Sequence, residues 1–241
     1  MQGIILCAGA GERLRPLTLE TPKPLLMVGD RTILEHTLDH LDSLGFTKIA
    51  INIHYKKESF FEFMRRYTSI VDKVTGRTEI WYKNINIVLS VENEPLGTAG
   101  AVKKIIGEGK ITADNFFVIY GDVISYYDHN FSGAMHLAQR ALATILYHER
   151  QINSSLQRNA WGQVYHFQEH PMVKTNSDIY WFNKDIISYI SDGFCDFPEN
   201  VFPKLPLHRF YAFPHVGYRI AIDTPERLEL ARKDHNEKPR Y

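Results

Sequence analysis

The chain has 241 residues, 44% of them hydrophobic, and its 28 Lys and Arg residues balance 28 Asp and Glu residues. This length and apolar content suit one large α/β domain, while the neutral balance argues against a general nucleic-acid or membrane surface. Two cysteines are too few for a disulfide framework. The first predicted strand follows residue 1 almost directly and no apolar run approaches a membrane span, so we expect a cytoplasmic protein.

The first predicted strand, residues 4–8, is an apolar run that is long enough for one buried strand and too short for a helix. It ends at Gly9-Ala10-Gly11, where glycine allows a sharp turn and close approach to a ligand. Three cations follow, Arg13, Arg15 and Lys23. Free backbone N–H groups beside cations suit a polyanion, and a triphosphate is the obvious candidate.

Periodicity then predicts alternating helices and strands up to residue 120. Thr32 can cap a helix with apolar residues spaced from Ile33 to Leu44. Residues 68–84 have no clear period, and we interpret them as an excursion. The other predicted elements are strands at 48–53, 85–91 and 115–120 and helices at 59–67 and 99–106. This alternation implies right-handed crossovers and a parallel sheet with the ligand at the carboxyl ends of its strands.

Two loops at that expected edge contain further candidate site residues. Gly97 and Ala99 leave room for a flat base, although this loop could simply lead into the next helix. The carboxylate of Glu92 only accepts hydrogen bonds, so it suits the adjacent N1–H and N2–H₂ donors of guanine. A solvated loop glutamate is the simpler alternative. Asp122 follows Gly121 at a strand end, where an acid faces the ligand crevice or forms a turn or helix cap.

From residue 141 the pattern changes to that of a mixed sheet, with strands predicted at 141–148, 163–167, 178–183 and 209–213. We expect a loop at 150–161, a helix near 184–190 and a polar, frayed tail from residue 233. A strand at 218–222 leads into a helix with Thr224 at its N-cap, so Asp223 could have only a capping role. The aromatic residues in this half suit either the core or a homodimer face, namely Trp161, Trp181 and Tyr211.

Residues 4–28 resemble the signature of the sugar-1-phosphate nucleotidyltransferases, and within that family the guanylyltransferases for mannose 1-phosphate and heptose 1-phosphate. The matching motifs are Ala8-Gly9-x-Gly11-x-Arg13-Leu14-x-Pro16-Leu17-Thr18 and Pro22-Lys23-Pro24-Leu25-Leu26. The resemblance implies an α/β fold, a Rossmann-like three-layer sandwich with a mostly parallel central sheet and a small mixed sheet on the sugar side. It also implies a single domain, with residues 1–125 binding the nucleotide and 126–241 the sugar phosphate.

The same resemblance implies that a sugar 1-phosphate attacks the α-phosphorus of a nucleoside triphosphate, with GTP favoured, and releases pyrophosphate. The implied catalytic residues are Arg13, Lys23, Asp122 and Asp223, with both aspartates holding Mg²⁺. Asp223 matches the shorter Asp-Thr-Pro-Glu turn of cytidylyltransferases of this fold, whereas gapless alignment with most of the family puts Ala221 at the metal position. The implied nucleotide-binding residues are Leu6, Ala8, Gly9, Ala10, Gly11, Glu92, Gly97, Thr98 and Gly121.

Residues 162–171 resemble the family motif whose lysine contacts the sugar phosphate, but His170 stands at that position. A histidine is only partly charged near pH 7, and Lys174 could replace it. Asn176 matches the family asparagine that binds sugar hydroxyls, and Asp178 replaces a glycine, which narrows the pocket or adds a hydroxyl acceptor. The implied sugar-phosphate-binding residues are Glu169, His170, Lys174 and Asn176.

Three alternatives stay open at this point. The chain could be a cytidylyltransferase or uridylyltransferase acting on another phosphorylated acceptor. It could be a non-catalytic regulatory paralogue that binds a sugar nucleotide, which His170 favours and intact Arg13 and Lys23 oppose. A dinucleotide-dependent reductase is a third alternative, and the leucine at the position of the third fingerprint glycine argues against it.

Overall fold

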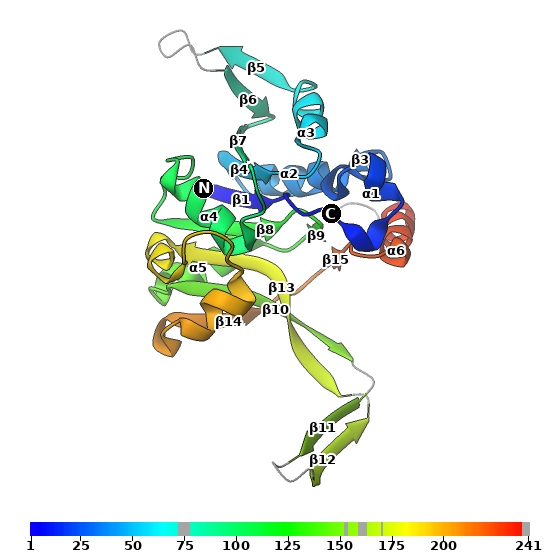
Figure 1. The fold of residues 1–241 in the computed structure, drawn as a ribbon, viewed down its shortest axis with the longest axis vertical. Coiled ribbons are helices and arrows are strands. Elements are labelled where there is room, and N and C mark those ends of the chain that lie inside the picture. The colour runs from blue at the N-terminus through cyan, green and yellow to red at the C-terminus, as the bar shows by residue number, and fades with distance from the viewer. Residues whose placement is uncertain (72–77, 152–153, 159–162, 170, 238–241) are drawn as a thin grey trace.

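The computed structural model describes residues 1–71, 78–151, 154–158, 163–169 and 171–237. Nine strands form one sheet in the order β14-β10-β13-β8-β1-β4-β7-β6-β5 (Figure 1). Their bounds are β1 Gln2–Leu6, β4 Lys48–Ile53, β5 Thr68–Val71, β6 Thr78–Tyr82, β7 Ile85–Val91, β8 Asn115–Tyr120, β10 Ala143–Gln151, β13 Met172–Asn183 and β14 Phe210–Pro214. Three two-stranded pairs complete the strands: β2 Met27–Val28 with β3 Arg31–Thr32, β9 Val123–Ser125 with β15 Arg219–Ala221, and β11 Ser154–Arg158 with β12 Val164–Glu169.

The helices are α1 Leu17–Glu20, α2 Ile33–Ser43, α3 Lys57–Met64, α4 Gly97–Gly107, α5 His129–Ala138 and α6 Pro225–Glu237. Short 3₁₀ helices cover Glu12–Leu14, Lys23–Leu25, Lys184–Tyr189, Phe202–Lys204 and Leu207–Arg209, and a π-helical turn covers Phe197–Val201. Thr32 caps α2 as predicted, because its hydroxyl accepts from the Glu35 N–H while the Glu35 side chain accepts from the Thr32 N–H. Within the described ranges, no helix is long and apolar enough to cross a bilayer.

The four central strands are parallel and contain the point where the strand order reverses. The chain builds β1, β4 and β7 in one direction and then places β8 on the other side of β1. Crossover connections therefore leave the β1 and β8 carboxyl ends in opposite directions, which opens a crevice between the two following loops. Leu6 and Tyr120 are the paired residues at these two ends. The sheet topology thus sets the place of the ligand site.

Alternation along the strands divides the core into two layers. In β8, Phe117 and Ile119 pack on the side of α2 and α3, whereas Phe116 and Val118 pack on the side of α4 and the 184–205 segment. All four side chains are at most 1% exposed, which the near-continuous apolar sequence of a strand covered on both faces predicts. A third core cluster lies under α6 and includes Ile124, Ile220 and Leu228.

Strands 48–53, 85–91 and 115–120 have the predicted bounds, but several elements elsewhere differ. The loop predicted at 150–161 was wrong, because β10 runs to Gln151 and β11 covers Ser154–Arg158. The 184–190 segment is a 3₁₀ helix, and α6 continues to Glu237 where a frayed tail was expected. Of the predicted mixed strands, those found as β10, β13 and β14 extend the central sheet, whereas β12 pairs with β11 in a separate two-stranded sheet. Trp181 belongs to the core, and Trp161 lies outside the described residues.

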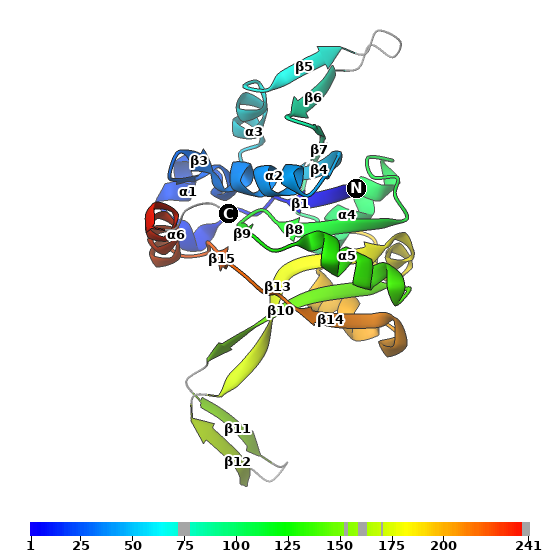
Figure 2. The ribbon, with the colours of Figure 1, turned by 180° about the vertical axis from the view of Figure 1, so that it is seen from behind.

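Two hairpins project from opposite ends of the molecule (Figures 1 and 2). The β5–β6 hairpin confirms that residues 68–84 contain an excursion, and it joins the sheet edge through antiparallel pairing of β6 with β7. At the other end, β10 and β13 continue beyond the body towards the β11–β12 pair. Glu169, the last residue of β12, lies in that projecting part.

Buried histidines should make the fold sensitive to acid. Burial lowers the pKa of His136 to about 4, and the nearby charge of Arg209 adds to this effect. The ring is hydrogen-bonded to Thr144 and Asn115. The unfolded chain, with a histidine pKa of about 6.5, takes up the proton first as the pH falls. We therefore expect His136 alone to reduce the free energy of unfolding by about 2 kcal/mol between pH 7.5 and pH 5.

Denaturant unfolding of the wild-type chain and of His136→Gln at these two pH values measures this contribution. The glutamine variant should lose less stability between the two pH values than the wild type does. His208→Gln, which changes an exposed histidine, is the matched control and should behave like the wild type. An equal loss in all three proteins would contradict the assignment to His136.

Candidate active site

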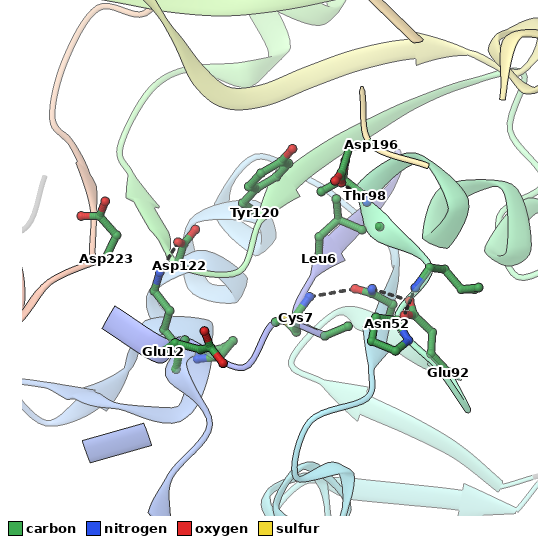
Figure 3. A pocket seen from close by; sticks show the side chains of 18 of the residues that line it. Leu6, Cys7, Glu12, Asn52, Glu92, Thr98, Tyr120, Asp122, Asp196 and Asp223 are labelled. Atoms are coloured by element: carbon green, nitrogen blue, oxygen red, sulfur yellow. Dashed lines mark hydrogen bonds and ion pairs between the residues drawn. The ribbon is translucent and has the colours of Figure 1, made fainter. Parts of the chain in front are cut away.

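A cavity of about 500 Å³ opens at the carboxyl ends of β1 and β8 (Figure 3). Eleven of the residues predicted to bind the nucleotide or to act in catalysis line it: Leu6, Ala8, Gly9, Gly11, Arg13, Lys23, Glu92, Gly97, Thr98, Asp122 and Asp223. Asp122 and Asp223 lie at one end of the cavity, and Glu92, Thr98 and Asp196 lie at the other (Figure 3). Acidic side chains thus lie at both ends of the cavity, in two separate groups. Ala10 belongs to the same loop as Gly9 but is not among the lining residues.

A short antiparallel pair brings the two distant aspartates to the same end. β9 and β15 pair with Ile220 opposite Ile124, and the Ile222 N–H donates to the Asp122 carbonyl at 2.8 Å. Asp223 is the next residue, so the ladder places its side chain beside the end of β8. The side chains of Ile124 and Ile220 fix this ladder against α6 in a core cluster.

Each aspartate has a basic partner from the first loop. Lys23 Nζ lies 2.5 Å from Asp122 Oδ2, and Arg13 Nη1 lies 2.9 Å from Asp223 Oδ2. The Lys23 side chain is only 12% exposed, whereas that of Arg13 is 71% exposed. Lys23 is thus held in a fixed place, while Arg13 has room to turn towards an incoming anion.

The donor set at this end fits a hard divalent cation. Within the part of the chain that the structure describes, Asp223 Oδ1 is buried and accepts no hydrogen bond, although Arg227 Nε lies 3.4 Å away as an ion pair. Mg²⁺ prefers oxygen ligands, so an unsatisfied carboxylate oxygen beside a second carboxylate suits this ion. Among the described residues, no cluster of three or more His, Cys, Asp or Glu that could hold a metal ion is found.

Two glycines allow the backbone to pass close to the cavity floor. Gly11 adopts φ +62, in the left-handed region, and its carbonyl accepts from the Thr18 hydroxyl at 2.9 Å. The Gly121 N–H donates to the Leu6 carbonyl at 2.8 Å, and a Cβ on Gly121 would lie 2.4 Å from Cys7 Sγ. Gly121 is therefore a packing residue below the cavity and is not among its lining residues.

Glu92 is fixed at the far end by a short chain of hydrogen bonds. Asn52 Nδ2 donates to Glu92 Oε1 at 2.7 Å, and Asn52 Oδ1 accepts from the Cys7 N–H at 2.7 Å. The Leu96 N–H donates to Glu92 Oε2 at 3.3 Å. Glu92 is only 2% exposed, and this burial raises the pKa of its carboxyl group. It is therefore a preorganised acceptor and not a solvated loop residue.

The structure does not bring the predicted sugar-phosphate residues together in this cavity. Glu169 is exposed on the projecting β12, and His170 lies outside the described residues. Lys174 Nζ lies 5.1 Å from the centre of the Tyr147 ring, and Asn176 Nδ2 donates to the Tyr180 hydroxyl at 2.6 Å. None of the three described residues, Glu169, Lys174 and Asn176, lines the cavity.

Asp178 lies beside the two aspartates and forms an ion pair that the sequence did not predict. Arg219 Nη2 lies 2.9 Å from Asp178 Oδ2, and Arg219 Nε donates to the Ser177 carbonyl at 2.9 Å. Burial raises the pKa of Asp178 to about 6, and the nearby charges of Asp122 and Asp223 add to this effect while Arg219 opposes it. Three carboxylates therefore share one electrostatic environment.

Several lining residues escaped the sequence analysis, namely Glu12, Asn52, Tyr120, Phe194 and Asp196. Asn52 offered a local signal, because it is a polar residue near the carboxyl end of an otherwise apolar strand. Phe194 and Asp196 offered none, since their neighbours in the fold lie about a hundred residues earlier in the chain.

Comparisons with known proteins agree with this geometry. The family described as nucleotidyl transferase matches residues 2–202. The chain is 30% identical to a mannose-1-phosphate guanyltransferase of Saccharomyces cerevisiae over 94% of its own length, and it spans 62% of that relative. A crystal structure of HddC from Yersinia pseudotuberculosis superposes with a TM-score of 0.75 at 25% identity, covering 97% of this chain and 99% of that one.

A second structure, of the same HddC complexed with GMP-PN, has a TM-score of 0.75 at 24% identity and shows the same fold. The predicted fold class, a Rossmann-like sandwich around a mostly parallel sheet, is confirmed. The resemblance inferred from the first loop is confirmed as well, since the family match begins at residue 2 and continues through both halves of the chain. This chain therefore belongs to the nucleotidyl transferase family.

Proposed function

We propose that this protein is a sugar-1-phosphate guanylyltransferase, which joins a sugar 1-phosphate to GTP and releases pyrophosphate. The observation that carries this proposal is the meeting of Asp122, Asp223, Lys23 and Arg13 at one end of a cavity located where the strand order reverses. Two acids paired with two cations can exchange those partners for a metal ion and a polyphosphate. The mannose-1-phosphate guanyltransferases among its relatives support the same reaction class.

In the proposed reaction an oxygen of the sugar phosphate forms a bond to the α-phosphorus of GTP. The bond from that phosphorus to the bridging oxygen breaks, and its electrons leave with pyrophosphate. The attacking phosphate is already a nucleophile, so alignment and charge neutralisation are the main requirements. Arg13, which is exposed, would bind the β- and γ-phosphates, while the enclosed Lys23 would neutralise charge on the α-phosphoryl oxygens.

Asp122 and Asp223 would hold Mg²⁺, and the unsatisfied Asp223 Oδ1 is the atom best placed to ligate it. When bound, the ion would supply positive charge and a common anchor for the two reacting phosphates. Arg13 would then leave Asp223 to contact the β- and γ-phosphates, while Lys23 would contact the α-phosphate from its enclosed position beside Asp122. The same four side chains thus have a paired arrangement without substrate and a reacting arrangement with it.

Glu92 supports the choice of guanine. Its carboxylate oxygens are held by Asn52 and by the Leu96 N–H, and each oxygen retains a further acceptor position. Guanine presents two adjacent donors, N1–H and N2–H₂, which match a carboxylate edge. Adenine and the pyrimidines lack that pair of donors. They would leave the Glu92 carboxylate without its hydrogen-bond partners, so this fixed acceptor favours guanine.

Residues 126–241 would contribute the acceptor side of the proposed site. β13 pairs with β8 so that Ile179 lies opposite Ile119, which puts Asp178 next to Tyr120 at the cavity edge. The carboxylate of Asp178, fixed by Arg219, is suited to accept hydrogen bonds from sugar hydroxyls. Asn176 precedes it by two residues, and its Oδ1 accepts from the Asp178 N–H at 3.0 Å. A cytoplasmic location also belongs to the proposal, and the two free, buried thiols Cys7 and Cys195 support it.

A pyrophosphate-release assay tests the function. The protein is incubated with Mg²⁺, with each of GTP, ATP, CTP, UTP and dTTP, and with mannose, heptose or glucose 1-phosphate. We expect pyrophosphate and a nucleotide sugar with GTP and one of these acceptors. Turnover with CTP or UTP alone would replace the guanine assignment, and the absence of turnover despite tight nucleotide binding would favour a regulatory role.

A further inference from the structure

Residues 193–197 form a segment that is docked on the amino end of α4. The Cys195 N–H donates to the Leu96 carbonyl at 2.9 Å, and the Cys195 carbonyl accepts from the N–H groups of Ala99 and Gly100 at 2.9 and 3.0 Å. Because these bonds run in both directions across the junction, the segment has a fixed register on the helix.

The side chain of Asp196 strengthens this docking. Its Oδ1 accepts from the Thr98 N–H at 2.8 Å and from the Thr98 hydroxyl at 2.9 Å, and the same hydroxyl accepts from the Phe197 N–H. The first N–H groups of a helix normally attract anions such as phosphate. Here the protein itself occupies three of them, and a carboxylate stands beside them, so this end of the cavity is unsuited to phosphate.

Glycines make the close approach possible. Gly97 adopts φ +72, and a Cβ at this position would lie 2.5 Å from the Cys195 carbonyl oxygen. A Cβ on Gly100 would lie 2.7 Å from the Gly193 carbonyl oxygen. The small residues at the start of α4 therefore receive the 193–197 segment directly.

The docking of this segment places Phe194 at the rim of the cavity. It lines the cavity, yet its side chain is 64% exposed, while Cys195 beside it is fully buried. Pro95 and Leu96 line the same end, next to the fixed acceptor Glu92. An exposed aromatic ring on a rigid support at the rim of a cavity is a feature of ligand sites, because its apolar face gains by being covered.

We propose that Phe194 stacks on the nucleobase of the bound nucleotide and supplies affinity that is independent of base identity. This inference rests on the proposed function, because it takes a nucleotide as the ligand. The charges divide the cavity accordingly: Lys23 and Arg13 attract phosphates at one end, whereas Asp196 and Glu92 repel them at the other. A planar, uncharged base fits the second end, where Glu92 reads its donors and Phe194 covers its face.

Calorimetric titration of the intact protein, without acceptor so that no chemistry is needed, tests this inference. The ligands are GTP and inorganic tripolyphosphate, which has no base, both with Mg²⁺. Phe194→Ala should raise the Kd for GTP about tenfold, the loss expected for one base–aromatic stack. Phe194→Tyr and Phe194→Trp should stay within about twofold of the wild type, because both keep a planar ring. The Kd for tripolyphosphate should be the same in all four proteins.

Phe131→Ala is the matched control, since Phe131 is 58% exposed on α5 and does not line the cavity. Unchanged GTP affinity in Phe194→Ala, or equal losses for GTP and tripolyphosphate, would overturn the stacking role. Tight GTP binding by the wild type without pyrophosphate release would defeat the proposed function and leave the stacking intact. Turnover with an unchanged KM for GTP in Phe194→Ala would support the proposed function and overturn the stacking role. A wild-type chain that binds no nucleotide would overturn both.

Discussion

Replacing Lys23 with alanine should lower kcat for pyrophosphate release by about 10²–10³, the range seen when one preorganised electrostatic contact to a transition state is removed. The reason lies in the position of the ammonium group, which is 12% exposed and held 2.5 Å from Asp122. An enclosed cation interacts more strongly with developing charge than one in water does. KM for GTP should change much less, because Arg13 would still contact the outer phosphates as proposed. Steady-state kinetics over a range of GTP concentrations measures both parameters.

A simpler explanation is that Lys23 only neutralises Asp122 and so acts on folding. Denaturant unfolding of Lys23→Ala, measured beside its kinetics, distinguishes the two roles. If neutralisation were the whole function, kcat would fall only as far as the folded fraction falls, whereas we expect the protein that remains folded to lose turnover. Lys184→Ala is the control, because this lysine pairs with Asp114 at an exposed site outside the cavity. Near-normal turnover in Lys23→Ala would contradict the proposed role.

Removing the metal should abolish turnover, and Asp223→Asn should raise the Mg²⁺ concentration for half-maximal activity at least tenfold. An amide oxygen is a weaker ligand for a hard cation than a carboxylate, and Asp223 Oδ1 is the buried acceptor without a hydrogen bond. Thermal melting gives a readout that does not depend on activity. The wild-type melting temperature should rise when Mg²⁺ is added to a GTP-containing sample, and most of that increment should be lost in Asp223→Asn.

Asp192→Asn is the control for this experiment, since that side chain is 98% exposed and does not line the cavity. It should keep the wild-type response to Mg²⁺ in both assays. An unchanged Mg²⁺ requirement in Asp223→Asn would mean that Asp223 serves only to hold Arg13. In that case the 2.9 Å ion pair would be a structural contact and the metal would need a different ligand.

Local sequence was sufficient for the four central parallel strands β1, β4, β7 and β8, because each is a short, mostly apolar run that can be buried on both faces. It was insufficient where long-range contacts decide the conformation. α5 was missed because Gly133 interrupts its helical pattern, yet the glycine is required there, since a Cβ would lie 2.7 Å from the Trp181 ring. β11 was missed because its sequence, Ser-Ser-Leu-Gln-Arg, has one apolar residue and gives no sign of a core-facing side.

The same distinction holds for the site. The first loop could be interpreted directly, because its glycines and cations are close together in sequence. Asp122 and Asp223 could be named individually, but their meeting depends on the β9–β15 pair, whose first strand was not predicted. Phe194 is the extreme case: it is an aromatic residue in an unremarkable loop, and only the docking of its neighbours on α4 gives it a position at the cavity.

The late position of β15 has a consequence for how the proposed site is completed. The nine-stranded sheet is complete once β14 has been added, whereas Asp223 follows only after β15. A nascent chain halted before residue 219 would contain every strand of that sheet and still lack one of the two carboxylates of the proposed metal site. We therefore expect competence only after residues 219–223 have emerged, and cleavage before residue 219 should abolish turnover without dismantling the main sheet.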